Sequence, residues 1–310
     1  MKVLVTCPPM LGMKEQFMPI FEAKNIEVHT PEVIQTLPEE ELIKLVPEFD
    51  GWIIGDDPAT RAVFEAGKKG NLKAAVKWGI GVDNVDFAAC KELDISITNT
   101  PNMFGAEVAD IAVNYVTALA RETYYIDRQV REGFWPKPRG TSLAGKIVGL
   151  IGYGDIGKNT AKRLIAADMT MIVYDPVFDE TNNTNRIQFT KWPDKISECD
   201  FLVFTCSLNE KNHHMLNAAV LAACKKGVRV VNVARGPLID EQALITALQS
   251  GQVHSAALDV FEVEPLPNNS PLRKMERCIF GSHNGSNTTE AVAATDNRAI
   301  KKLFEFLGVN

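Results

Sequence analysis

Three ionisable side chains follow separate apolar runs in the second half of the chain, and their types suit acid binding and proton transfer. Arg235 follows the run RVVNVA, Glu264 lies in LDVFEVEP, and His283 lies in FGSHNGSNT. An arginine can hold a carboxylate through two hydrogen bonds and polarise an adjacent carbonyl. A histidine can take a hydroxyl proton as hydride leaves the carbon, and a glutamate on its far ring nitrogen would favour the imidazolium. Together these groups suit oxidation of a 2-hydroxy acid.

Each of these residues also has a purely structural interpretation. Arg235 could cap a helix or join a structural ion pair, and Glu264 could be a solvated loop acid. His283 could be a surface histidine or one whose ring nitrogens are satisfied in the core. The adjacent His213 and His214 lie in a polar turn, so we expect both to be exposed. Spacing alone leaves these alternatives open.

The stretch Lys146–Pro176, KIVGLIGYGDIGKNTAKRLIAADMTMIVYDP, has the order strand, glycine turn, helix, strand and acid. In such a unit Gly152 allows the tight turn, and Gly154 lets the backbone approach a pyrophosphate. Gly157 lets the helix and strand pack closely. A lone glycine pattern is weak evidence, but the flanking strands and the acid make this one specific. The stretch predicts a dinucleotide-binding site.

Two acidic residues refine the prediction of the cofactor. The helix that begins near Asp155 would point free N–H groups and a partial positive charge at the phosphates. Asp175 lies 18 residues after Gly157 (175 − 157), close to the ~20 at which a carboxylate meets the adenosine ribose. A carboxylate there would repel a 2′-phosphate, so we expect NAD rather than NADP.

Short apolar runs alternate with amphipathic stretches through the first hundred residues, as in a parallel sheet covered by helices. The expected strands are Lys2–Val5, Ile26–His29, Gly51–Ile54, Ala74–Lys77 and Ile95–Thr98, and the expected helices are Lys14–Ala23, Glu39–Leu45, Thr60–Ala66 and Val85–Leu93. Cys7-Pro8-Pro9 stands where a glycine loop would follow the first strand. We therefore expect this segment to serve something other than the cofactor.

The rest of the chain repeats this alternation. Apolar residues with a period near 3.6 predict one long helix over Ala106–Glu132. Further strands are expected at Phe201–Thr205, Arg229–Val233 and Ser255–Leu258, and further helices at Asn217–Cys224, Glu241–Gln249 and Glu290–Leu307. A long helix at each boundary suggests that the C-terminal segment packs back on the first domain, with a cleft between two domains.

Composition narrows the class of protein. The chain has 310 residues, 45% hydrophobic and 23% charged, which is ordinary for a soluble protein of about two domains. The net charge of −6 argues against nucleic-acid binding, which needs a cationic surface. No run approaches the ~18 continuous apolar residues of a membrane span. Six cysteines without metal-ligand spacing indicate reduced thiols, a cytoplasmic location and no metal site.

Several long motifs in a fixed order then allow a comparison with a known family. The chain resembles the D-isomer-specific 2-hydroxyacid dehydrogenases over nearly its whole length, and among them is most similar to the D-3-phosphoglycerate dehydrogenases. The resemblance is densest in WGIGVDNVD (78–86), NTPN (99–102), LAGKIVGLIGYGDIG (143–157), CKKGVRVVNVARGPLIDEQALITALQSGQ (224–252), ALDVFEVEP (257–265) and SHNG (282–285).

The resemblance implies a fold, a cofactor and a set of site residues. It implies two doubly wound parallel-sheet domains of α/β class: a Rossmann-type NAD domain at 101–287 and a flavodoxin-like substrate domain from 1–100 and 288–310. Arg235, Glu264 and His283 would be catalytic. Backbone N–H groups of Ile80, Gly81 and Val82 would hold the substrate carboxylate. Besides the three glycines, the cofactor would be lined by Asp155, Ile156, Asp175, Cys206, Val233, Ala234, Asp259 and Ser286. Members are usually homodimers.

Departures from the family pattern limit what can be said of the substrate. Phosphoglycerate enzymes place an arginine at the end of the third strand, where this chain has Gly55-Asp56-Asp57, whose acids would repel a phosphate. Lys77 stands where an arginine is common. We expect a 2-hydroxy or 2-keto acid, with phosphoglycerate as one candidate. The alternative function is a non-catalytic NAD(H)-responsive binding protein of the corepressor type.

Overall fold

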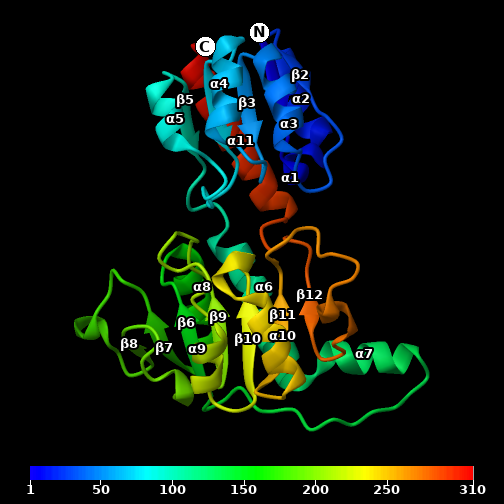
Figure 1. Cartoon of the computed structure of the whole chain (residues 1–310), viewed down its shortest axis with the longest axis vertical. Coiled ribbons are helices and arrows are strands. Elements are labelled where there is room, and N and C mark those ends of the chain that lie inside the picture. The colour runs from blue at the N-terminus through cyan, green and yellow to red at the C-terminus, as the bar shows by residue number, and fades with distance from the viewer. Residues whose placement is uncertain (310) are drawn as a thin grey trace. The chain divides into compact units, whose positions relative to one another are not determined.

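The computed structural model describes residues 1–309, which divide into two compact units (Figure 1). The first unit consists of Met1–Met103 and Asn287–Asn310, and the second of Phe104–Ser286. Each unit is built on one sheet whose strands are all parallel. The predicted α/β class with two parallel sheets is therefore confirmed.

The first unit has a five-stranded sheet in the order β2-β1-β3-β4-β5. Its strands are β1 (Lys2–Val5), β2 (Glu27–His29), β3 (Gly51–Ile54), β4 (Ala74–Lys77) and β5 (Ser96–Asn99). Its helices are α1 (Pro8–Leu11), α2 (Lys14–Glu22), α3 (Glu39–Leu45), α4 (Arg61–Lys69), α5 (Phe87–Glu92) and α11 (Thr289–Leu307). The strands and longer helices predicted here are present with ends shifted by at most three residues.

Side-chain caps set where three of these helices begin. Thr60, Asp86 and Thr288 each accept a hydrogen bond from the backbone N–H three residues later, at the starts of α4, α5 and α11. Such a cap satisfies one of the free N–H groups of the first turn and is worth about 1 kcal/mol. The chain thus marks its helix starts with residues that can be recognised in the sequence.

Helix α11 returns from the end of the chain to cover β3 and β4 of the first unit (Figure 1). A Cβ on Gly51 would lie 3.1 Å from Leu303 Cδ1, so the helix packs directly on the strand. Its Asp296 Oδ1 accepts a hydrogen bond of 2.7 Å from Trp78 Nε1. Because Asp296 is only 4% exposed, burial raises the pKa of its carboxyl to about 7.

The second unit has a seven-stranded sheet in the order β12-β11-β10-β9-β6-β7-β8. The strands are β6 (Ile147–Ile151), β7 (Thr170–Tyr174), β8 (Ile187–Phe189), β9 (Phe201–Phe204), β10 (Val228–Asn232), β11 (Val253–Leu258) and β12 (Ile279–Phe280). The strand order reverses between β6 and β9, since β7 and β8 lie on one side and β10 to β12 on the other. Open parallel sheets bind ligands beyond the carboxyl ends of the strands at such a point.

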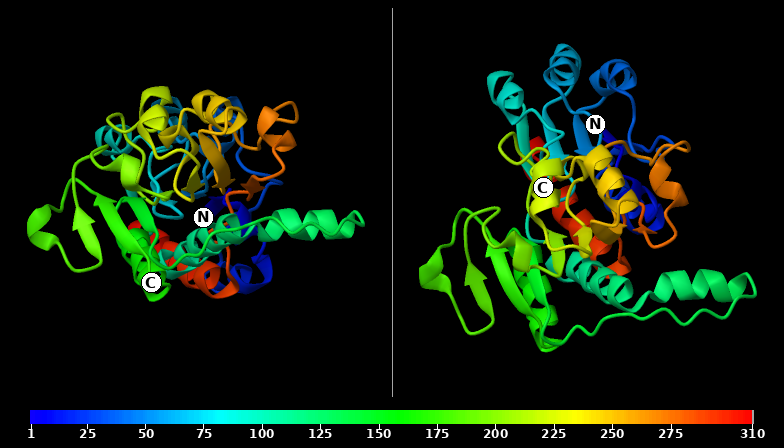
Figure 2. Two further views of the ribbon diagram at one scale, coloured as in Figure 1. Left: turned by 90° about the horizontal axis from the view of Figure 1, so that it is seen from below. Right: turned by 60° about the horizontal axis from the view of Figure 1, so that its bottom comes forward.

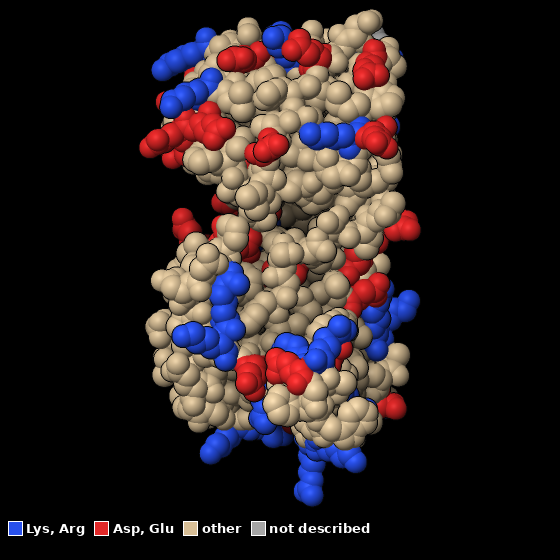
Figure 3. Space-filling view, turned by 90° about the vertical axis from the view of Figure 1, so that its right-hand side faces the viewer, with Lys and Arg blue, Asp and Glu red and all other residues tan. Residues whose placement is uncertain are grey.

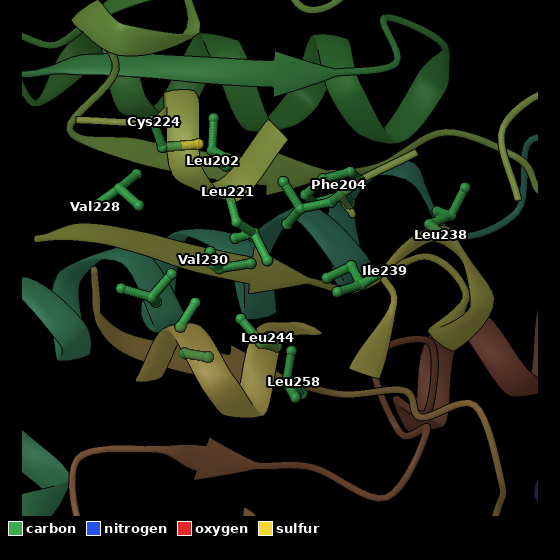
Figure 4. Packing of buried hydrophobic residues seen from close by; sticks show 14 of the residues in the cluster. Leu202, Phe204, Leu221, Cys224, Val228, Val230, Leu238, Ile239, Leu244 and Leu258 are labelled. Atoms are coloured by element: carbon green, nitrogen blue, oxygen red, sulfur yellow. The ribbon is translucent and has the colours of Figure 1, made fainter. Parts of the chain in front are cut away.

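Helices cover both faces of this sheet. Two of them, α6 (Gly105–Arg121) and α8 (Asp155–Ala166), pack together on one face, and α9 (Ala218–Ala223) and α10 (Glu241–Gln249) pack on the other (Figure 2). Figure 4 shows the apolar cluster beneath α9 and α10, in which Leu221 and Leu244 meet strand residues Leu202, Val230 and Leu258. The buried strands hold the loops at their carboxyl ends in place.

The prediction of one continuous helix over 106–132 is wrong. Glu122 has a left-handed backbone, φ +58°, which ends α6, and a separate helix, α7 (Thr123–Arg131), begins at the next residue. The buried Glu122 carboxylate lies 3.3 Å from His254 Nε2. The apolar pattern shows only which face of a helix is buried, so it did not reveal this polar contact.

Charged side chains are distributed over the surface of both units. On the face that Figure 3 shows, acidic and basic side chains are interspersed on each unit. Over residues 1–309, no helix combines the length and apolar composition needed to cross a bilayer.

Candidate active site

The glycine turn after β6 has the local geometry that each of its glycines was expected to allow. Gly152 has φ +96°, and a Cβ there would lie 2.7 Å from the Cα of Cys206. A Cβ on Gly157 would lie 2.2 Å from the carbonyl oxygen of Gly152, so α8 packs against the turn. Apart from its neighbours in the chain, none of the described residues has an atom within 4 Å of the Cβ position of Gly154, which caps α8. The turn therefore leaves open space beside the N-terminus of a helix, as a pyrophosphate requires.

The first residues of α8 face the second unit's own core as well as this turn. Asp155 begins the helix, and a Cβ on Gly105 would lie 2.3 Å from the Asp155 carboxyl group. Asn159 Nδ2 donates to Asp155 Oδ1 at 3.2 Å. The side chain of Asp155 is thereby held against the start of α6, while its backbone and that of Ile156 stay in the first turn of α8.

Asp175 closes the glycine turn from the end of the neighbouring strand β7. Its Oδ2 accepts a hydrogen bond of 2.7 Å from the Tyr153 N–H, and its Oδ1 accepts one of 2.9 Å from the Val177 N–H. Each carboxylate oxygen keeps a lone pair for a further donor. A negative charge fixed beside the turn fits ribose hydroxyls and disfavours a 2′-phosphate.

Three further residues from the predicted cofactor set lie at the carboxyl ends of β9 and β10. Cys206 packs against Gly152, and burial raises the pKa of its thiol to about 12. Val233 and Ala234 follow β10, on the neighbouring strand. These residues and the glycine turn line the reversal point of the sheet.

Asn232 shapes the loop that presents Arg235. This residue ends β10 and is 1% exposed. Its Nδ2 donates to the Arg235 carbonyl at 2.8 Å, and its Oδ1 accepts the Ala234 N–H at 3.0 Å. Asn232 is not among the residues predicted from the sequence, although a polar residue at the end of the apolar run VRVVN was an available signal. Gly236 follows Arg235, and a Cβ added to it would lie 1.9 Å from the Phe261 backbone. The loop that carries Arg235 is therefore in contact with the loop that carries Glu264.

The three candidate catalytic side chains come together in the second unit. His283 Nδ1 lies 2.8 Å from Glu264 Oε2, and His283 Nε2 lies 3.4 Å from Arg235 Nη1. Glu264 is itself held by the Phe261 N–H, which donates to Oε1 at 2.9 Å. The side chains of His283 and Glu264 are 22% and 20% exposed, so solutes can reach them. A proton on Nδ1 shared with Glu264 leaves the Nε2 lone pair facing the arginine.

Asp259 holds the backbone on which His283 sits. The His283 N–H donates to the Asp259 carbonyl at 2.7 Å, and the Asp259 carboxylate accepts the Asn284 and Gly285 N–H groups at 3.3 and 2.8 Å. Tyr115, from α6, hydrogen-bonds the same carboxylate, and burial raises the pKa of both side chains. Tyr115 could not be predicted as part of this network, because at its helical position it reads as an ordinary apolar residue.

The remaining predicted site residues lie outside the contacts that join Arg235, Glu264 and His283. Ser286 is partly buried at the end of the second unit, whereas Ile80, Gly81 and Val82 lie in the first unit. The turn before them has Gly79 at φ +113° and is tied to β5, since Asn99 Nδ2 donates to the Ile80 carbonyl at 3.2 Å. The structure thus brings the charged trio together within the second unit and builds the Gly79–Val82 turn in the first.

The prediction that both polar-turn histidines are exposed holds only in part for His214, whose exposure is intermediate. Its Nε2 lies 2.7 Å from Glu262 Oε1, and its side chain is only partly exposed. His213 is exposed, as expected. The carboxylate that contacts His214 is 48 residues away along the chain (262 − 214), which a local polar pattern does not show.

Comparison with known proteins now decides the family. Residues 113–285 match the model of the D-isomer specific 2-hydroxyacid dehydrogenase, NAD binding domain. The chain belongs to this family. A hydroxypyruvate reductase of Thermotoga maritima is 36% identical over 302 residues, covering 96% of this chain and 96% of that protein. A D-3-phosphoglycerate dehydrogenase of Methanocaldococcus jannaschii is 35% identical over 314 residues, covering 99% of this chain and 57% of that protein.

A solved structure is also similar over nearly the whole chain. The NAD-dependent formate dehydrogenase of Staphylococcus aureus in complex with NAD superposes with a TM-score of 0.85 at 26% identity, covering 99% of this chain and 96% of that chain. The family resemblance inferred from the sequence is confirmed, and so is the prediction of an NAD-dependent D-2-hydroxyacid dehydrogenase. The open glycine turn and the fixed Asp175 carboxylate fit that cofactor.

Proposed function

We propose that this dehydrogenase interconverts a D-2-hydroxy acid and its 2-keto acid with Arg235, Glu264 and His283 as the catalytic residues. The proposal rests on the two contacts of the His283 ring. Its Nδ1 contacts the Glu264 carboxylate, and its Nε2 faces the Arg235 guanidinium, which can bind an acid. This arrangement places a proton acceptor next to the group that would bind the substrate's acid.

In the proposed mechanism each side chain has a separate task. The Arg235 guanidinium holds the substrate carboxylate and polarises the oxygen on the neighbouring carbon. His283 Nε2 takes the hydroxyl proton during oxidation and returns it during reduction, while Glu264 stabilises the resulting imidazolium from Nδ1. When bound, NAD supplies the hydride acceptor for the substrate carbon, and NADH the donor.

The two units have different proposed roles. The second unit would bind NAD through the glycine turn Gly152–Gly157, Asp175 and the loop residues Cys206, Val233, Ala234, Asp259 and Ser286. The first unit would bind the substrate acid through backbone N–H groups of Ile80, Gly81 and Val82. The turn that carries these three is held in shape by Asn99 and Thr100, the latter accepting the Gly79 N–H at 2.7 Å.

Oxidation of NADH against a panel of 2-keto acids tests the proposal. The panel should contain hydroxypyruvate, glyoxylate, pyruvate and 3-phosphohydroxypyruvate. We expect turnover with at least one of them, and a loss of roughly 10²–10⁴-fold in kcat for His283→Ala, the usual contribution of a positioned acid–base group. Arg235→Ala should lose turnover and substrate binding together, while NADH binding measured by fluorescence is retained.

A matched control uses another partly exposed histidine of the same unit. His214→Ala removes a ring that pairs with Glu262, outside the trio, and should leave kcat within about twofold. Near-normal turnover by Arg235→Ala would refute the assignment. Tight NADH binding with no turnover of any acid would instead favour the non-catalytic, NAD(H)-responsive function.

We also propose that the protein is a homodimer joined through its second units. Figures 1 and 2 show α7 and the chain that follows it standing away from the sheet of that unit. None of the residues of α7 is buried, and Val130, Phe134 and Trp135 nearby are 42%, 59% and 78% exposed. Large exposed apolar side chains in one segment are typical of an interface. Sedimentation of the wild type and of Trp135→Glu tests this, with a shift of the variant towards monomer expected.

The cysteines support a proposed location. All six are free thiols, and five of them are buried. Free thiols persist in reducing compartments, so we propose that the enzyme works in the cytoplasm.

A further inference from the structure

His283 has a backbone conformation that contacts from outside its own loop must stabilise. Its φ is +55°, in the left-handed region, where the side chain crowds the following carbonyl. The contacts that fix this loop come from Asp259. Its carbonyl accepts the His283 N–H at 2.7 Å, and its carboxylate accepts the N–H groups of Asn284 and Gly285. The position of the His283 ring therefore depends on where Asp259 lies.

The Asp259 carboxylate has a third donor, the hydroxyl of Tyr115. A Cβ on Gly281 would lie 2.0 Å from Asp259 Oδ1 and 2.7 Å from Tyr115 Oη, so the two side chains meet beside the backbone of that glycine. Tyr115 is 6% exposed and Asp259 is 3% exposed. At such a buried point water does not readily replace a lost donor, so the hydroxyl is needed to keep the carboxylate in place.

Helix α6 gives Tyr115 a fixed base, because the helix packs on α8 and on strands β10 and β11. Val108 lies on the same face of α6, two turns before Tyr115 (115 − 108 = 7 residues). A Cβ on Gly285 would lie 3.6 Å from Val108 Cγ1 and 3.0 Å from Asp259 Oδ2. The helix thus supports the His283 loop near both of its ends, at residues 281 and 285.

We propose that Tyr115 is a positioning residue for His283, to which it is linked through Asp259. This inference rests on the proposed function, in which His283 Nε2 transfers the substrate proton. The Tyr115 hydroxyl holds the Asp259 carboxylate, the carboxylate holds the backbone on both sides of the loop, and the loop sets where Nε2 points. Proton transfer needs Nε2 within hydrogen-bond reach of the substrate oxygen, so a shift of the loop slows that step.

Tyr115→Phe removes the hydroxyl and keeps the ring. Its kcat is measured by NADH oxidation with the 2-keto acid of the panel that wild type turns over fastest. We expect kcat to fall by about tenfold, because a small displacement of a reacting group is enough for a loss of this order. KM for the acid and Kd for NADH should stay within about twofold of wild type, since the change affects the proton-transfer step.

The same substitution in a His283→Ala enzyme separates positioning from a general loss of structure. If Tyr115 acts through the His283 ring, Tyr115→Phe should leave the residual kcat of His283→Ala unchanged within about twofold. A general structural effect would lower kcat about tenfold in both backgrounds.

Another buried tyrosine of the same unit provides the control. Tyr174 is 4% exposed, and its hydroxyl donates to the Asp194 carbonyl at 2.8 Å. Tyr174→Phe also removes a buried hydrogen bond, but away from the His283 loop, so it should keep kcat within about twofold. A Tyr115→Phe enzyme with the kcat of Tyr174→Phe, or an equal loss in the His283→Ala background, would overturn the inference. Wild-type turnover by His283→Ala would overturn the proposed function, and this inference with it.

Discussion

Asp296 gives a prediction whose size follows from its pKa. The carboxyl is buried against Trp78, and its pKa is raised to about 7 in the folded protein, against ~3.9 for an unperturbed aspartate. A tenfold change in a proton-binding constant is worth ~1.4 kcal/mol, so ionising this group costs the fold about 4 kcal/mol in full. Because the folded pKa is the higher one, the stabilisation is complete below pH ~4 and is lost as the pH rises through 7.

Asp296→Asn removes this titration and keeps an acceptor for Trp78. We expect the variant to gain stability relative to wild type as the pH rises. The linkage relation gives a change of roughly 2–3 kcal/mol in the stability difference between pH 5 and pH 8. Comparing the two proteins with each other cancels the titration of all other groups and any constant effect of the amide.

Urea unfolding at several pH values measures this difference. Tryptophan fluorescence can follow the first unit, since Trp52 and Trp78 are both buried there. Asp94→Asn, a substitution at a solvent-accessible aspartate of the same unit, serves as the control and should change stability equally at both pH values. If Asp296→Asn differs from wild type by the same amount at pH 5 and pH 8, the reasoning from burial is refuted.

Three further predictions concern residues of the proposed cofactor site. Gly154→Ala should keep the melting temperature but weaken NAD binding about tenfold in a fluorescence titration, because the new methyl group enters the open space beside the turn. Gly157→Ala should instead lower the melting temperature by several degrees, because its Cβ would lie 2.2 Å from the Gly152 carbonyl oxygen. Asp175→Ser should narrow the preference for NAD over NADP at least tenfold in kcat/KM, and an unchanged preference would show that this carboxylate does not select the cofactor.

The elements that could be predicted from the sequence are those with strong local signals. The strands β1, β3 and β4 are largely buried and read as short apolar runs, while Thr60, Asp86 and similar caps mark helix starts. The glycine turn can be recognised from the spacing of Gly152, Gly154 and Gly157. These features depend on residues close together in the chain, so a sequence pattern is enough to find them.

The features that could not be predicted depend on contacts between distant residues. The break at Glu122 accompanies a contact with His254, and the Arg235 loop depends on Asn232 turning its amide back on the backbone. Tyr115 meets Asp259 across 144 positions (259 − 115). None of these pairs has a periodic signature, because each is fixed by the packing of strands and helices that are separate in the sequence.

The way the chain passes between the two units has a consequence for its synthesis. The second unit is one uninterrupted segment, whereas the first needs α11 from the far end of the chain to cover β3 and β4. On the ribosome, Phe104–Ser286 can therefore fold before α11 has been synthesised. Until then the five-stranded sheet of the first unit has one face uncovered. We expect chaperones to bind the nascent chain at this uncovered face.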